Sequence, residues 1–124
     1  MASAKSIKWL KQVDKEDFAA ARSYLELLYP PEQCRSLVRG LRSARIRRFP
    51  AKDILRASEL TVLDAKEPNV ARQFKKLRKG EGFSPLLLVR ERGGRARVIV
   101  ADGFHRLCVA MHVDESGEVP CKLA

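Results

Sequence analysis

The sequence predicts an α+β domain in which helices pack on a small β-sheet. Apolar residues recur at helical spacing through residues 14–44, which predicts a pair of helices. Two apolar runs, at 86–89 and 98–100, flank Gly93-Gly94, which predicts a β-hairpin. The second run changes to helical spacing at Asp102-Gly103, which predicts a strand that leads directly into a helix.

Length and composition favour one domain. A chain of 124 residues with 45% hydrophobic residues can bury one core, so we expect a single domain over residues 1–124. Within it, residues 1–44 form a helical N-terminal extension and residues 45–124 form the α/β core. The sequence has no apolar run long enough to span a bilayer and no secretory signal pattern. We therefore expect a cytoplasmic protein with no membrane partner.

The cysteines do not predict a metal or disulfide site. Their number is odd and no two have metal-ligand spacing; they are Cys34, Cys108 and Cys121. Cys108 lies in an apolar helical segment and Cys121 alternates along an expected strand. We expect buried, reduced thiols.

The charge is strongly positive and unevenly distributed. The net charge is +10, from 25 Lys and Arg against 15 Asp and Glu. Residues 101–124 hold only two basic residues against four acidic ones, so the excess lies earlier in the chain. This balance favours nucleic acid, anionic nucleotides or acidic partners, and it does not bear on the fold.

The N-terminal part predicts two helices. Residues 1–13 have a weak pattern, and we expect a turn that holds Trp9 and Leu10 against the body of the protein. Asp14 is expected to cap a helix that continues to Tyr29. Its inward face is expected to consist of four apolar residues at helical spacing, Phe18, Ala21, Leu25 and Leu28. A second helix over about 31–44, beginning at Pro31, should pair with it as an antiparallel hairpin.

A run of arginines follows the apolar stripe of the second helix. From residue 35 to residue 48 there are six arginines and no acidic residue: Arg35, Arg39, Arg42, Arg45, Arg47 and Arg48. A solvated face is one interpretation. The planar guanidinium also suits phosphate and acidic groups, so anion binding is the alternative.

The middle of the chain predicts short elements. Residues 46–49 favour a strand, and 51–58 favour a helix with Ile54 and Leu55 inward. Residues 59–68 predict a loop with one extended piece. Asn69 is expected to cap a further helix, whose outward basic residues include Lys75, Lys76 and Lys79 and which ends at glycine.

The expected hairpin has an unfavourable tip. A two-residue turn at Gly93-Gly94 would place Arg90 opposite Arg97 and Arg92 opposite Arg95, and like charges across a ladder repel. Either the loop is longer, or the basic tip projects into water or onto an anion; we favour water.

After the second strand, residues 104–114 predict a helix and 119–123 a last strand. Pro120 predicts that this strand starts at a sheet edge or that the proline is its first residue.

The junction after Asp102 predicts an anion site. A helix start offers free backbone N–H groups and the positive end of the helix dipole. His105 and Arg106 lie in the first helical turn. The pattern predicts a class of ligand and no particular reaction.

The order of elements from about residue 49 to 123 resembles the N-terminal domain of the ParB family and the wider ParB/sulfiredoxin superfamily. The resemblance is carried by Gly82-Phe-Ser-Pro-Leu-Leu-Leu-Val-Arg90, by Val98-Ile-Val-Ala-Asp-Gly-Phe-His-Arg-Leu107 and by Glu118-Val-Pro-Cys-Lys122. It implies a small mixed sheet with packed helices. It also implies that nucleotide phosphates bind at the glycine turn, with Gly103, Phe104, His105 and Arg106 as the contact residues.

The chain departs from the superfamily at that turn. Sulfiredoxins have Cys-His-Arg there, and this chain has Phe104 in place of the cysteine, so sulfiredoxin chemistry is not expected. ParB proteins have Gly-Glu-Arg-Arg, of which Gly103 and Arg106 match. Asp102 and His105 are the only candidate catalytic residues. Turn formation or helix capping is the simpler role for Asp102. The alternative is that it contacts Mg²⁺ beside bound phosphates.

These observations give one leading hypothesis and three alternatives. The leading hypothesis is a ParB-like domain that binds a phosphate-bearing ligand, a nucleoside triphosphate with Mg²⁺ being the expected form. The second is a nucleic-acid-binding module for DNA or RNA that uses the six arginines, with Lys75, Lys76 and Lys79 as further candidates. A nucleotide-dependent kinase or hydrolase and a protein-interaction adaptor are the others. The sequence leaves the oligomeric state open.

Overall fold

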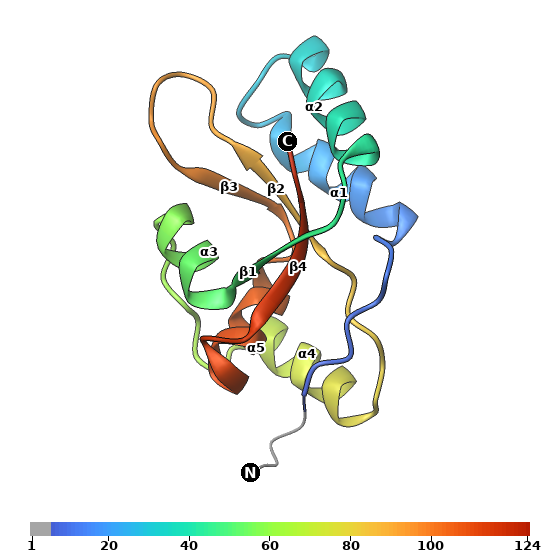
Figure 1. The fold of residues 1–124 in the computed structure, drawn as a ribbon, viewed down its shortest axis with the longest axis vertical. Coiled ribbons are helices and arrows are strands. Elements are labelled where there is room, and N and C mark those ends of the chain that lie inside the picture. Colours follow the sequence, from blue (N-terminus) through green and yellow to red (C-terminus); the bar gives the residue numbers. More distant parts are fainter. Residues whose placement is uncertain (1–5) are drawn as a thin grey trace.

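The computed structural model describes residues 6–124 and confirms an α+β fold (Figure 1). Over these residues, helices and strands alternate irregularly along the chain. The elements are α1 (Lys15–Leu25), α2 (Pro31–Ser43), β1 (Arg47–Pro50), α3 (Ala51–Ser58), α4 (Pro68–Arg78), β2 (Leu86–Arg90), β3 (Val98–Asp102), α5 (Phe104–Asp114) and β4 (Glu118–Leu123).

The four strands form one mixed sheet in the order β1-β4-β2-β3. β1 pairs with β4 and β2 pairs with β3 in antiparallel fashion, whereas β2 and β4 are parallel. The run from Leu86 to Val89 is buried throughout, because β2 lies inside the sheet with helices on both faces. β4 as a whole lies between β1 and β2, and Pro120 is its third residue and not its first, but the expected edge position holds at the start of the strand. At Pro120 only β1 lies beside it, since the pairing of β4 with β2 begins at Cys121, and this position tolerates the missing N–H.

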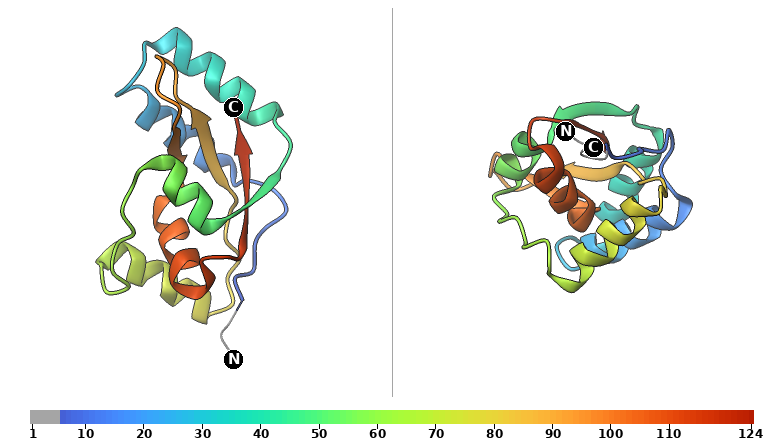
Figure 2. Two further views of the ribbon diagram at one scale, coloured as in Figure 1. Left: turned by 60° about the vertical axis from the view of Figure 1, so that its left-hand side comes forward. Right: turned by 90° about the horizontal axis from the view of Figure 1, so that it is seen from below.

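Each face of the sheet has its own apolar core. On one face, α1 and α2 pack against side chains of β2 and β3, with Leu25, Leu41, Leu87 and Ile99 in one buried cluster. On the other face, α3 and α5 pack against residues that alternate with these, among them Leu86 and Leu88. The N-terminal helices therefore cover a sheet face that would otherwise be exposed (Figure 2).

The segment before α1 and the helix α4 complete the far end of the molecule. Trp9 forms an isolated parallel bridge with Phe83, and the two rings meet edge to face at 5.8 Å. The Leu10 amide donates to the carbonyl of Phe83 at 2.8 Å. The expected attachment of Trp9 and Leu10 is confirmed for the described residues, while residues 1–5 lie outside them. α4 packs on α5 around Val70 and Cys108.

Two helix boundaries differ from expectation. α1 ends at Leu25 instead of Tyr29, because the amide of Leu28 and that of Tyr29 both donate to the carbonyl of Leu25 and close a turn; Leu28 is 45% exposed. At α4 the capping residue is Glu67 instead of Asn69. The Glu67 carboxylate accepts hydrogen bonds from the amides of Asn69 and Val70 at 2.8 and 2.9 Å. Asp14 precedes α1 as expected but caps without its side chain.

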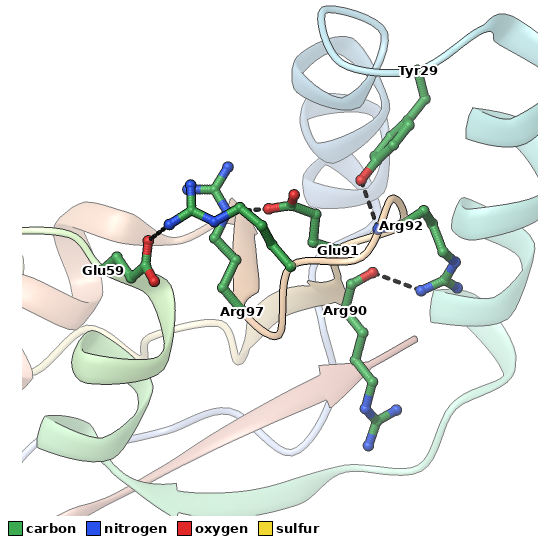
Figure 3. Close-up of polar contacts among 7 residues, drawn as sticks. Tyr29, Glu59, Arg90, Glu91, Arg92 and Arg97 are labelled. Atoms are coloured by element: carbon green, nitrogen blue, oxygen red, sulfur yellow. Dashed lines mark hydrogen bonds and ion pairs between the residues drawn. The ribbon is translucent and has the colours of Figure 1, made fainter.

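The hairpin loop is longer than two residues. Arg90 lies opposite Val98, so the predicted pairs Arg90–Arg97 and Arg92–Arg95 do not form. Figure 3 shows how the tip is held: Arg97 forms an ion pair with Glu91, and the amide of Arg92 donates to the Tyr29 hydroxyl at 3.0 Å. Arg95 forms an ion pair with Glu59. The longer loop thus replaces like-charge pairs with pairs of opposite charge.

The three cysteines are buried and free, as expected. Burial raises the pKa of the Cys121 thiol to about 11, so this side chain is a poor nucleophile near neutral pH. Among the described residues, no helix has the length and apolar character needed to cross a membrane.

Candidate functional site

The turn between β3 and α5 depends on a glycine. Gly103 has a φ of 106°, in the left-handed region that favours glycine. A Cβ at this position would lie 2.8 Å from Cγ of Leu86 and 2.9 Å from Nη2 of Arg106. The carbonyl of Gly103 accepts the first helical hydrogen bond, from Leu107 at 2.9 Å. Close packing on both sides therefore explains this glycine without any ligand.

Arg106 is turned inward at this junction and binds two carboxylates. Its Nη2 lies 3.2 Å from Asp102 and 3.4 Å from Asp17, which comes from α1. The same nitrogen donates to the carbonyl of Pro85 at 3.4 Å. The three charged side chains are only 15–18% exposed. We call these residues the Asp17–Asp102–Arg106 cluster; it joins α1 to the β3–α5 turn across 89 positions of the chain.

The electrostatics of this cluster are unbalanced, with two carboxylates for one guanidinium. Burial raises the pKa of Asp102 from 3.8 to about 6; the Arg106 charge opposes this shift and the Asp17 carboxylate adds to it. The positive charge that the sequence analysis assigned to a phosphate is therefore neutralised within the protein. The Nε of Arg106 is buried without a hydrogen-bond partner.

The other residues of the expected phosphate site lie nearby but do not form a catalytic group. Phe104 packs against the two apolar clusters on either side of α5, and its ring lies 5.7 Å from that of His105. Backbone hydrogen bonds lower the pKa of Glu67, and the charge of His105 acts in the same direction. Asp102 has Arg106 as its partner, so Asp102 and His105 do not form an acid–base pair.

The donors at this turn do not fit Mg²⁺. Both nearby carboxylates already bind a guanidinium, and a divalent cation there would face like charge. Within residues 6–124 no group of three potential ligands could hold a metal ion.

The six arginines of the second candidate site lie on α2, on the segment after it and on β1. All are exposed, and over the described part of the chain none lies within 4.0 Å of a carboxylate. We call them the arginine surface: Arg35, Arg39, Arg42, Arg45, Arg47 and Arg48. The lysines proposed alongside them lie on α4 and directly after it, at the opposite end of the molecule from α2 (Figure 1). The two basic sets therefore do not form one binding surface.

Two shallow grooves beside α2 carry this charge. One, of about 360 Å³, lies between α1 and α2 and is lined by Arg35, Arg39 and Arg42. The next, of about 350 Å³, adds Lys11 and Lys122. The Arg42 guanidinium stacks over the Phe18 ring between them, 4.6 Å from its centroid. Within the part of the chain that the structure describes, no acidic residue lines either groove.

Sequence reasoning missed several residues of both sites. Asp17 is an acidic residue in the first turn of α1, and nothing in its local pattern indicates a partner at Arg106. Lys122 is the lone basic residue of the last strand, and its ammonium donates a hydrogen bond to the carbonyl of Arg42 at 2.9 Å. Both contacts depend on the sheet order, which short-range patterns do not reveal.

Comparison with known proteins adds no assignment. No protein-family model, no curated protein and no solved structure matches this chain. The resemblance to the ParB/sulfiredoxin superfamily stays a prediction.

Replacing Arg106 with alanine is expected to destabilise the fold by about 3 kcal/mol, because it leaves two partly buried carboxylates without a cation. Urea denaturation measures this loss. The triple variant D17N, D102N, R106M removes all three charges and should recover part of the stability. Arg78→Ala, at an exposed position of α4, is the control. A loss below about 0.5 kcal/mol, the usual range for a surface change, would contradict the structural role of the cluster.

The pH dependence of stability should contain a contribution from Asp102. Its pKa is raised in the folded state, so protonation stabilises the fold fully below about pH 4 and this contribution is lost as pH rises through about 6. The unfolding free energy of the parent, relative to Asp102→Asn, should fall by on the order of 2 kcal/mol over that interval. Denaturation at pH 4, 6 and 7.5 tests this. The variant Glu16→Gln, on an exposed site of α1, should keep the parental profile; identical profiles for D102N and the parent would refute the expectation.

Proposed function

We propose that the protein binds nucleic acid through phosphate contacts made by the arginine surface. The observation that supports this most is the absence of acidic residues from the two grooves beside α2, where four arginines and two lysines gather. One of these, Arg22, is paired with Glu26 at 3.2 Å. The others lie next to a groove with no competing carboxylate in its lining.

The arrangement favours a repeating anion. Arg35, Arg39 and Arg42 lie along one side of α2, and a rise of about 1.5 Å per residue spreads them over about 10 Å. Arg45 and Arg47 extend the charge past the end of the helix to β4, around a further groove lined with Leu123. A guanidinium stacked on an aromatic ring, as Arg42 is on Phe18, keeps its N–H edges free for phosphate oxygens.

Phosphate contacts alone give affinity with little sequence preference. The aromatic content is 6%, and Phe18 is 7% exposed and covered by Arg42. Base stacking on this surface is therefore not part of the proposal. The nucleic acid is bound by its backbone, and release of counterions drives the association.

The affinity for a DNA or RNA duplex should fall steeply with salt. The double variant R35Q, R39Q should bind about tenfold more weakly at about 50 mM salt, and the slope of log K against log salt should decrease by about 2, one for each lost phosphate contact. Fluorescence anisotropy over a salt series measures both quantities. K76Q, K79Q removes the same charge from α4 and is the matched control.

Two results would overturn this function. One is undetectable binding of both DNA and RNA at about 50 mM salt. The other is an equal loss in the α2 and α4 double variants, which would indicate net charge instead of a defined surface. Poly-glutamate that competes as well as nucleic acid would assign the surface to an acidic protein.

A nucleotide at the β3–α5 turn is a second candidate, because the Arg106 Nε is a buried donor without an acceptor. An unmade buried hydrogen bond costs about 1–3 kcal/mol, which a phosphate oxygen could recover. The amides of residues 104–106, in the first turn of α5, would be the further donors. A kinase or hydrolase activity has no support beyond this turn.

The test of the second candidate is a thermal-shift screen of nucleoside triphosphates with and without Mg²⁺. A ligand at the turn should raise Tm in the parent and raise it less in His105→Ala, a change that spares the Asp17–Asp102–Arg106 cluster. His112→Ala, on an exposed face of the same helix, is the control. No shift with any nucleotide, or equal shifts in parent and His105→Ala, would reject this site.

A further inference from the structure

A separate cavity of about 460 Å³ opens on the sheet face that carries α3 and α5. All four strands contribute an apolar side chain to it: Phe49 from β1, Leu123 from β4, Leu88 from β2 and Val98 from β3. Ile54 and Ala57 of α3 form one wall. The cavity lies on the opposite sheet face from α1 and α2, so it is distinct from the grooves beside α2.

The cavity exists because the helices do not cover this whole face. α5 packs against the part of the sheet around Leu86, Val119 and Cys121. α3 is only 8 residues long and lies beside the rest of the face (Figure 2). Phe49, Val98 and Leu123 are consequently only partly buried, although they belong to the same apolar cluster. An apolar ligand here would extend a core that the protein leaves open.

The rim of the cavity is positively charged. Its lining contains three arginines, Arg47, Arg56 and Arg90, and one acid, Asp53. Arg56 is paired with Asp53 at 3.4 Å. Two guanidinium groups therefore remain, and over residues 6–124 neither has a carboxylate within 4.0 Å.

The two remaining arginines approach the cavity from neighbouring parts of the sheet. Arg47 lies over the Phe49 ring, 5.1 Å from its centroid. Figure 3 shows that the Arg90 side chain points away from the paired residues of the hairpin tip. Only the main chain of Arg90 takes part in hydrogen bonds there: its amide donates to Ala124 and its carbonyl accepts from Arg92. Its charge is available to a ligand.

We propose that this cavity binds a small organic anion with an apolar body, such as an aliphatic or aromatic carboxylate. The four strand side chains would contact the apolar body, and Arg90 and Arg47 would bind the carboxylate at the rim. An uncharged hydrocarbon leaves both guanidinium groups unused, and a bare anion gains nothing from the apolar floor. Ligand pockets commonly combine an apolar lining with a few charged groups that orient the ligand.

The test compares three probes: octanoate has both features, octanol only the apolar body, and acetate only the charge. Isothermal titration calorimetry should give one octanoate site with a Kd on the order of 0.1–1 mM, octanol binding at least about fivefold weaker, and no saturable binding of acetate. Amide chemical shifts measured by NMR should change at Phe49, Ala57 and Leu123 and not in α2 or α4.

Variants separate the two parts of the site. Arg90→Gln should weaken octanoate binding about fivefold and leave octanol unchanged. Ala57→Phe, at an exposed position of the α3 wall, should fill the cavity and abolish both. Arg78→Gln is the charge-matched control and should change nothing. Arg47 belongs to the arginine surface as well, but Arg90 does not, so the R90Q result is independent of nucleic-acid binding.

Three outcomes of the binding and NMR measurements would overturn the proposal. They are no saturable octanoate binding at about 5 mM, several times the expected Kd; equal affinity for octanoate and octanol; and shift changes located away from the cavity. An equal loss in R90Q and R78Q would also reject it, because a specific contact at the rim would then be absent.

Discussion

The inward position of Arg106 is the constraint on which the rest of the structure depends. A guanidinium that is largely buried needs carboxylates, and here one comes from the end of β3 and the other from α1. The pair to Asp17 fixes α1 against the edge strand. The apolar residues of α1 then cover Leu87 and Ile99 on the sheet face below. Electrostatic pairing and apolar burial thus specify the same arrangement of α1.

The same constraint separates two kinds of basic residue in this chain. The Nη2 of Arg106 has three acceptors that the fold supplies, and the charge of this side chain is balanced before any ligand arrives. The arginines of α2 and β1 are exposed and have no such partners in the described structure. A sequence pattern that places a basic residue at a helix start does not distinguish these cases, because the decisive neighbour lies 89 positions away. The exposed arginines are the better candidates for an external anion.

The sequence predicted most elements because their patterns are local. The spacing of Phe18, Ala21 and Leu25 was sufficient to predict α1, and the apolar run of residues 86–89 was sufficient to predict the first strand of the hairpin. What local patterns could not predict was competition between hydrogen-bond partners: Glu67 replaced Asn69 as a cap, and opposite charges lengthened the hairpin loop. The cavity beneath α3 was also unpredicted. It depends on how far a short helix reaches across a four-stranded sheet.

The place of β4 in the sheet has a consequence for how the chain acquires its structure during synthesis. β4 lies between β1 and β2, although these two precede it by many residues. Until residues 118–123 have left the ribosome, β1 has no sheet partner and β2 exposes one of its edges. The nascent protein would therefore present one unpaired edge of the apolar strand β2 until residues 118–123 are made. The sheet closes by insertion of β4 between two strands made before it, and not by growth outward from a finished hairpin.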